Sequence, residues 1–107
     1  MNKEDIAAGV FGILEGANQG FFEAFVKVKG EKVSVFYEKL DEPAERFLDI
    51  DVQRREMTFY LFPKSYNAEQ ACIGLVGDLK KEGFKVGGLV DFIEKPRFKE
   101  KDKISLY

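Results

Sequence analysis

Three carboxylates stand close together in the middle of the sequence, at Asp49, Asp51 and Glu56. Asp49 and Asp51 belong to a stretch of alternating apolar and polar residues, and a β-strand with that alternation carries both carboxylates on one face. Oxygen ligands arranged in this way could bind a divalent cation, and paired carboxylates could act as general acid and base. Because no glycine-containing ligand loop follows them, we expect no metal site here. An enzymatic or small-molecule-binding domain built on these carboxylates is the third of three functional hypotheses.

Other residue types that carry catalysis are scarce. The sequence has no histidine and one cysteine, Cys72, and it shows no nucleophile elbow, no glycine-rich phosphate loop and no zinc-ligand spacing. Cys72 lies within an apolar stripe, so we expect a buried and inert thiol. One cysteine excludes an internal disulfide and is typical of a reducing compartment. We therefore predict a protein that is not an enzyme and uses no cofactor.

Aromatic and charged side chains give the stronger functional signal. The alternation predicts that they share the second face of a sheet, opposite an apolar core face, and a solvated face of that kind is normally polar. An excess of aromatic side chains on such a face is typical of an interface. The interface candidates are the aromatic residues Phe25, Phe36, Phe47, Tyr60 and Phe62, the basic residues Lys27, Lys29 and Lys32, and the acidic residues Asp49, Asp51 and Glu56.

The predicted layout of this second face favours protein–protein recognition. The aromatic residues form a central band, the lysines gather at one edge and the carboxylates at the other, so a two-fold axis would bring unlike charges together. We expect a small interaction domain of the adaptor, chaperone-like, immunity or inhibitor kind, and a homodimer formed through this face. The competing arrangement is a monomer in which residues 84–107 cover the same aromatic side chains.

Single-stranded nucleic acid is the second hypothesis for this face. Aromatic rings interleaved with lysines also occur on the sheet platforms on which bases stack. Asp49, Asp51 and Glu56 would repel phosphate, however. The net charge of the chain is −2, which disfavours binding that is driven by phosphate contacts.

Four alternating segments position these side chains. They predict an antiparallel meander with strands at residues 22–29, 32–40, 45–52 and 55–62. A shift of one residue in any pairing would turn the apolar side chains to the other face, so the apolar pattern constrains the register. In the predicted registers, Val28 lies opposite Val33 in the first pairing, Val33 opposite Val52 in the second and Ile50 opposite Met57 in the third.

Two helices are expected to cover the apolar face. Residues 3–18 repeat apolar residues at helical spacing after a capping Asn2, and a second helix starts at Asn67 and ends at Gly83. Both helices contain glycines, which we expect to let them lie close together: Gly9, Gly12 and Gly16 in the first, Gly74 and Gly77 in the second.

The chain closes with one or two further strands. Residues 84–94 are predicted to form a strand that either bulges or turns at Gly87 and Gly88. About the last 12 residues form a charged tail with a short terminal strand at residues 104–107. The fold class is therefore a two-layer α+β domain spanning residues 1–107. With no long apolar run in the sequence, we expect no membrane segment and a cytoplasmic protein.

Overall fold

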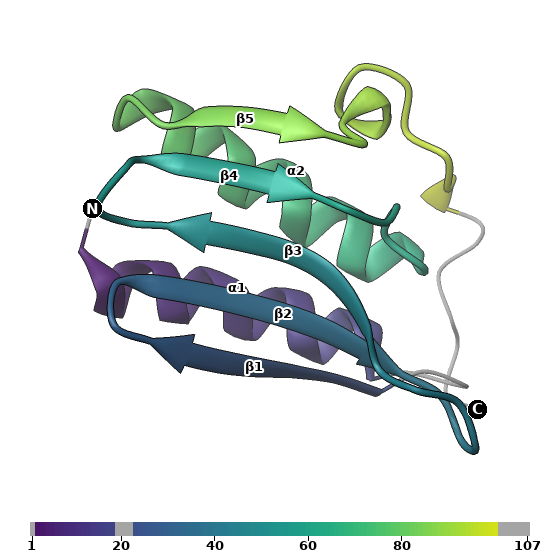
Figure 1. Ribbon diagram of the computed structural model, residues 1–107. Helices are drawn as coiled ribbons and strands as arrows, with labels where there is room; N and C mark the ends of the chain where they lie inside the picture. The colour runs from purple at the N-terminus through teal and green to yellow at the C-terminus, as the bar shows by residue number, and fades with distance from the viewer. Residues whose placement is uncertain (1, 19–22, 101–107) are drawn as a thin grey trace.

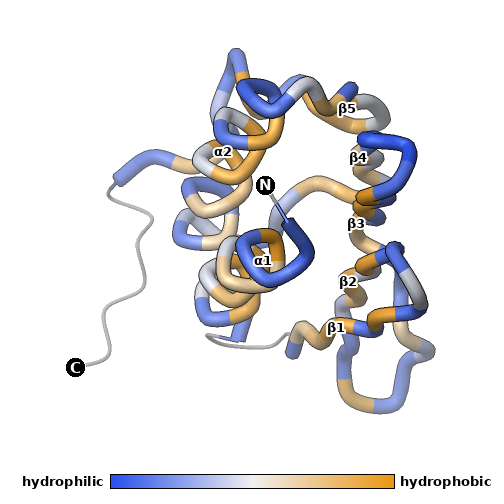
Figure 2. Tube along the Cα trace, turned by 90° about the vertical axis from the view of Figure 1, so that its left-hand side faces the viewer, coloured by the Kyte–Doolittle hydropathy of each residue, from blue (hydrophilic) through white to orange (hydrophobic). Residues whose placement is uncertain are grey.

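The computed structural model of the chain describes residues 2–18 and 23–100. It has two layers, a five-stranded sheet and a pair of helices that lie on one face of it (Figures 1 and 2). The predicted α+β architecture is confirmed, with a helix, a four-stranded antiparallel meander, a second helix and a further strand. The elements in chain order are α1 (Lys3–Ala17), β1 (Glu23–Lys29), β2 (Lys32–Glu38), β3 (Glu45–Asp51), β4 (Glu56–Phe59), α2 (Tyr66–Lys81), β5 (Lys85–Gly88) and a short 3₁₀ helix, η1 (Asp91–Ile93).

The start of α1 is the one predicted. The side chain of Asn2 accepts a hydrogen bond from the backbone N–H of Asp5, and the Asp5 carboxylate accepts one from the N–H of Asn2. This reciprocal capping box satisfies two donors that the first turn of a helix leaves without partners.

The cap of α2 differs from the prediction. Ser65, not Asn67, caps the helix, because its hydroxyl accepts the N–H of Ala68. The same hydroxyl donates to the carbonyl oxygen of Gly16 at 2.8 Å, so the start of α2 is tied to the end of α1. A serine at this position satisfies a donor of one helix and an acceptor of the other.

The glycines of α1 allow the two helices to lie close together. A Cβ atom on Gly16 would lie 2.6 Å from the backbone nitrogen of Ala68, and one on Gly9 would lie 2.6 Å from Leu75 Cδ1. The expected role is confirmed for Gly9 and Gly16, whereas a Cβ on Gly12 would lie at an ordinary 3.8 Å from Ala71 Cβ. Gly74 and Gly77 of α2 have open space where a Cβ would be, so the prediction was wrong for the second helix.

The register between β1 and β2 is the predicted one. Val28 lies opposite Val33, and a two-residue turn joins the strands. Gly30 in that turn has φ +59°, a backbone conformation that glycine adopts without the steric cost of a side chain. The first residue of the predicted strand, Phe22, lies outside the described residues.

The register between β2 and β3 corrects the prediction. Val33 lies opposite Ile50 instead of Val52, and the pairing shifts again at Phe36, which lies opposite Arg46 while Val35 lies opposite Leu48. The extra residue on β3 is a bulge, and a bulge reverses the faces of the residues that precede it. The connection between the two strands is too long to set the register by turn geometry alone.

The register between β3 and β4 agrees with the sequence, since Ile50 lies opposite Met57. The connection is longer than a two-residue turn, because β3 ends at Asp51 and β4 begins at Glu56. Arg55 has φ +53°, a left-handed conformation that completes this turn.

β5 pairs in parallel with β4 and completes the sheet. Gly87 and Gly88 neither bulge a strand nor turn a hairpin, since β5 ends at Gly88 and η1 follows. Gly88 has φ +85°, and a Cβ there would collide with the carbonyl of Phe59 on β4, so only glycine fits. The predicted strand at residues 104–107 lies outside the described part of the chain.

The core lies between the layers and contains a run of aromatic rings. Tyr37, Phe47, Phe59 and Phe92 follow each other at centroid distances of 4.6, 5.6 and 5.2 Å. Phe92 of η1 is fully buried, so this short helix anchors the segment that follows β5 to the core. In the part of the chain that the structure describes, no helix is both long and apolar enough to cross a membrane.

Candidate binding site

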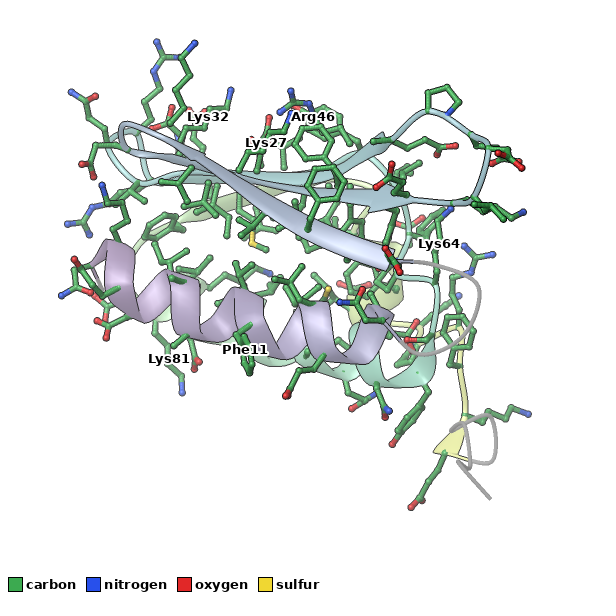
Figure 3. The ribbon with its side chains drawn as sticks, turned by 90° about the horizontal axis from the view of Figure 1, so that it is seen from below. Phe11, Lys27, Lys32, Arg46, Lys64 and Lys81 are labelled. Atoms are coloured by element: carbon green, nitrogen blue, oxygen red, sulfur yellow. The ribbon has the colours of Figure 1, made fainter. Side chains whose placement is uncertain are left out.

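The second face of the sheet points away from both helices and carries most of the predicted site residues. Figure 3 shows Lys27, Lys32 and Arg46 on this face and Phe11 and Lys81 on the helix side. Because the register between β2 and β3 differs from the prediction, Lys32 lies opposite Asp51. Basic and acidic residues are thus neighbours on this face, and they are not gathered at opposite edges.

The basic side chains surround a groove of about 260 Å³ on β1, β2 and β3, which we call the basic groove. A groove of this size suits one or two side chains better than a drug-sized molecule, for which pockets of about 300–1,000 Å³ are usual. Within the described chain no carboxylate is among the lining residues, which are Lys27, Lys29, Lys32, Ser34, Phe36 and Arg46.

Asp49 lies beneath two of these cations and holds them in place. Its side chain is 9% exposed, and Oδ1 accepts a hydrogen bond from Arg46 Nη1 at 2.5 Å. Lys32 Nζ lies 3.6 Å from Oδ2, and the Tyr60 hydroxyl donates to the same oxygen at 3.3 Å. Burial opposes ionisation of Asp49. Hydrogen bonds from Ser34 and Arg46, with the charges of Arg46 and Lys32, outweigh it and lower the pKa of the carboxyl.

One phenylalanine, Phe36, lines the groove, and a second, Phe25, stacks against it. Phe25 on β1 and Phe36 on β2 are cross-strand partners, and their rings stack with centroids 5.3 Å apart and planes 11° apart. Lys27 Nζ lies 5.4 Å from the centroid of Phe36, and the guanidinium carbon of Arg46 lies 5.0 Å from it. Cation–π contacts of this kind add to the ordering of the basic side chains.

The remaining predicted aromatic residues, Phe47, Tyr60 and Phe62, do not line the groove. Phe47 is fully buried in the core, so its predicted place on the second face was wrong. The bulge in β3 turns it inward. Phe62 is half-buried and packs against the core, with the Arg97 guanidinium 4.4 Å from its ring centroid. Tyr60 is 47% exposed and binds Asp49.

Arg46 is a basic residue of the groove that the sequence did not single out. Strict alternation places it on the core face, together with Leu48 and Ile50. The signal that could have found it is the adjacent apolar pair Phe47 and Leu48 behind a charged residue, since two successive inward side chains are typical of a bulge. With the bulge in place, Arg46 joins Lys27, Lys29 and Lys32 around the groove.

The three carboxylates singled out in the sequence do not form a common site. Asp49 is engaged by Arg46 and Lys32, and Asp51 accepts the backbone N–H of Arg54 at 3.0 Å. Across residues 2–18 and 23–100, no group of three or more His, Cys, Asp or Glu side chains is placed to hold a metal ion. Cys72 is buried, and burial and the nearby Glu69 raise the pKa of its thiol.

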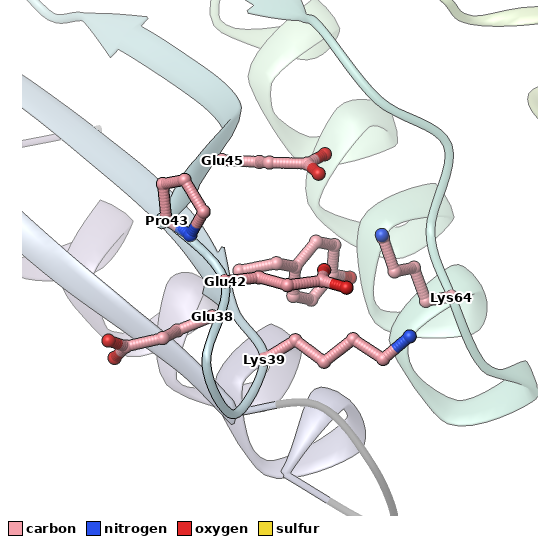
Figure 4. Close-up of a pocket in the computed structure, with 7 residues that line it drawn as sticks. Glu38, Lys39, Glu42, Pro43, Glu45 and Lys64 are labelled. Atoms are coloured by element: carbon pink, nitrogen blue, oxygen red, sulfur yellow. The ribbon is translucent and has the colours of Figure 1, made fainter.

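A second, smaller cavity of about 150 Å³ lies at the other end of β2 (Figure 4). Its lining mixes carboxylates with lysines: Tyr37, Glu38, Lys39, Glu42, Pro43, Glu45 and Lys64. Burial raises the pKa of Tyr37, so its hydroxyl stays neutral. A cavity with both signs of charge attracts neither anions nor cations strongly. The basic groove is therefore the better candidate site.

Comparison with known proteins adds no assignment, because no protein-family model, no curated protein and no solved structure matches this chain.

Proposed function

We propose that this chain is a protein-binding domain that receives an acidic segment of a partner protein in the basic groove. The observation that carries the proposal is the charge of the groove. Four cationic side chains line it on a chain whose net charge is −2. A local concentration of one sign of charge steers oppositely charged partners and selects against the others.

The side chains of the groove are held in fixed positions, which supports binding through side-chain contacts. Arg46 is held from below by Asp49 and from the side by Phe36. An arginine fixed in this way loses little conformational entropy when its free donors bind a carboxylate. Arginine and aromatic residues also dominate the energetics of known interfaces. Arg46 and Phe36 would therefore anchor the partner, and the more exposed lysines would speed its association.

Single-stranded nucleic acid is less well supported by the same geometry. Base stacking needs an open ring face, yet Phe36 has Phe25 against one side and Arg46 close to its ring. The basic area is also short. Glu23 and Glu38 pair across β1 and β2 immediately beyond the phenylalanines, where they would repel a continuing phosphate chain.

The charge layout that favoured a homodimer through the second face is not the one found in the structure. The prediction rested on a central aromatic band between a basic edge and an acidic edge. Phe47 is in the core and Lys32 lies beside Asp49 and opposite Asp51, so a two-fold axis through this face no longer opposes unlike charges. A partner with its own acidic segment fits the groove better.

The unpaired Cys72 thiol is consistent with a cytoplasmic setting.

Titration with three labelled probes tests the proposal: a short glutamate-rich peptide, a lysine-rich peptide of the same length and a single-stranded oligothymidylate. We expect only the glutamate-rich peptide to bind well, with an affinity that falls as salt rises. Lys27→Glu should weaken binding at least tenfold. Lys81→Glu makes the same charge change on the helix side (Figure 3) and should leave binding nearly unchanged. Tighter binding of the oligonucleotide would replace this proposal with the nucleic-acid alternative, and binding of neither anionic probe would reject the groove.

A further inference from the structure

The outer edge of β1 is a long strand edge without a partner strand among the described residues. The order of the sheet is β1-β2-β3-β4-β5, so β1 and β5 form its two edges. β5 is four residues long and ends in two glycines, whereas β1 is seven residues long. Long exposed edges readily accept another strand, and natural proteins usually block them with charges, prolines or bulges.

The hydrogen-bonding groups on this edge belong to alternate residues. Lys29 and Lys32 flank the two-residue turn and are therefore a hydrogen-bonded pair, so the N–H and C=O groups of Val28, Val26 and Ala24 point away from β2. The N–H of Ala24 is already bound by the side chain of Asn18. Among residues 2–18 and 23–100, nothing else binds the backbone groups of Val26 and Val28 or the carbonyl of Ala24 on this edge, so a neighbouring strand could pair with them.

The side chains beside this edge are apolar on the helix side. Val26 is 39% exposed and Val28 is 54% exposed, although both belong to the face that forms the core in the neighbouring strands. Val33 and Val35, which lie opposite them on β2, are almost completely buried. The core therefore continues to the edge of the sheet and is left partly uncovered there.

We propose that β1 pairs in antiparallel fashion with β1 of a second copy of this chain, with the two-fold axis at Val26. Two five-stranded sheets would then form one continuous sheet across the dimer. The helix side would pair Val26 with Val26 and Ala24 with Val28. The second face would pair Glu23 with Lys29 and Phe25 with Lys27. The central residue Val26 lies on the opposite side of the sheet from the basic groove, whereas Lys27 and Lys29 belong both to this contact and to the lining of the groove. The proposal itself rests on the edge of β1 and not on the proposed function.

Charge complementarity selects this register. Glu23 and Lys29 are the two ends of β1, and an antiparallel pair centred on Val26 places each opposite the other in the second copy. Cross-strand pairs of opposite charge and of aromatic with cation are stabilising. A pair centred on Lys27 would set Lys27 opposite itself, which is unfavourable. A pair centred on Phe25 would leave Val28 and Lys29 without described partners on β1.

Hydrogen exchange of the wild-type protein provides a test that needs no variant. In a monomer, the amides of Val26 and Val28 point to solvent and should exchange rapidly. In the proposed dimer they bind the second copy, so their protection should rise with protein concentration in step with the mass measured by sedimentation. A wild-type monomer at the highest soluble concentration, with both amides unprotected, would overturn the proposal.

Variants at Val26 locate the contact. Val26→Pro removes an outward N–H without removing a bond to β2, and Val26→Lys sets two like charges together at the two-fold axis. Each should raise the dimer dissociation constant at least tenfold. Leu89→Lys is the matched control, because Leu89 is 41% exposed and lies after β5 at the far edge. A dimer that survives both Val26 variants is formed elsewhere, and the proposal is then wrong.

A charge reversal tests the register itself. Lys29→Glu places two glutamates opposite each other, at residues 23 and 29 of the two copies, and should weaken the dimer. Adding Glu23→Lys to the same chain restores unlike charges in the proposed register and should recover the dimer. Recovery is scored by sedimentation alone, because Lys29 also lines the basic groove. A double variant as weak as the single one would exclude the Val26-centred register.

Discussion

Arg46 and Asp49 are three residues apart in one strand and yet form an ion pair on the same face of the sheet, with Nη1 2.5 Å from Oδ1. In a regular strand, residues three apart point to opposite faces. The bulge opposite Val35 and Phe36 adds one residue to β3, so Arg46 turns to the second face and Phe47 to the core. One local irregularity therefore places both a core residue and a residue of the candidate site.

Asp49 makes the first prediction, because its ion pairs stabilise the folded state only when the carboxyl is ionised. Asp49→Asn should lower the free energy of unfolding by about 1–3 kcal/mol at neutral pH, the usual cost of leaving charged hydrogen-bonding partners unmatched. The pKa of Asp49 is lowered in the folded state. Its contribution is therefore complete above the unfolded pKa of about 3.9 and is lost as the pH falls through the folded pKa.

Denaturant unfolding of both proteins over a range of pH measures this effect. The difference between wild type and Asp49→Asn should be largest near neutrality and should shrink below about pH 4. Glu56→Gln, at an exposed position of the neighbouring strand, is the control and should change stability little. A difference that does not depend on pH would show that the ion pairs contribute nothing measurable.

Much of the fold was predictable because short turns and apolar alternation constrain it together. The β1–β2 pairing followed from the turn at Gly30, and the β3–β4 pairing followed from the alternation of Ile50 and Met57. The β2–β3 pairing was not predictable in this way, because residues 39–44 form a connection that does not set a register. Alternation of apolar and polar residues also could not show that a bulge turns Phe47 to the core face.

The same reasoning explains what was found of the candidate site. Lys27, Lys29 and Lys32 lie next to a tight turn, where the register was correct, and all three line the basic groove. Arg46 lies beyond the bulge and was missed. The position of Asp49 beneath two cations depends on that shifted register. The sequence predicted basic and acidic side chains at opposite edges of the second face, whereas the structure places them side by side. This difference comes from the connection between β2 and β3, which did not set the register.

Gly16 makes a prediction about the contact between helices. An alanine Cβ there would lie 2.6 Å from the backbone nitrogen of Ala68, and a backbone cannot yield as a side chain can. Gly16→Ala should cost about 1–3 kcal/mol, the range for overpacking. Gly12→Ala is the matched control, because its Cβ would lie at an ordinary 3.8 Å from Ala71 Cβ. It should be neutral or stabilise α1 by up to about 1 kcal/mol. Equal stabilities of the two variants would contradict the close approach at Gly16.

Leu75 makes a prediction about packing beneath the sheet. The side chain is 4% exposed, so Leu75→Ala should cost about 2–5 kcal/mol. Gly9→Ala alone forces the Leu75 side chain to shift, because its Cβ would lie 2.6 Å from Leu75 Cδ1, and this cost opposes the gain in helix propensity. In the Leu75→Ala background that atom is absent, so Gly9→Ala should be more favourable to stability than in wild type. A double-mutant cycle from thermal or denaturant unfolding measures the coupling, and strict additivity would show that the two residues do not meet.

We expect the Cys72 thiol to react only when the protein unfolds. The residue is completely buried in α2, and burial raises the pKa of the thiol, so the reactive thiolate is scarce and inaccessible in the folded state. Alkylation by iodoacetamide should be slow under native conditions and should accelerate with denaturant in step with the loss of structure. Fast native labelling would mean that α2 opens locally without global unfolding.

Glu69 makes the last prediction, because it is a fully buried carboxylate that holds the end of the described chain. Its oxygens accept the backbone N–H groups of Arg97 at 2.9 Å and Phe98 at 3.2 Å. Glu69→Ala would leave both donors without their acceptor, and we expect a loss of about 1–3 kcal/mol in the free energy of unfolding.

Glu69→Gln separates the charge of this carboxylate from its geometry. The amide oxygen can still accept one N–H, but the amide nitrogen cannot accept the other. The free energy of unfolding of Glu69→Gln should therefore lie between those of wild type and Glu69→Ala. Hydrogen exchange should show faster exchange at Arg97 and Phe98 in both variants, with the β1–β2 amides unchanged. If those two amides exchange equally slowly in all three proteins, the packing of Phe92 in the core, and not Glu69, fixes the path of this segment.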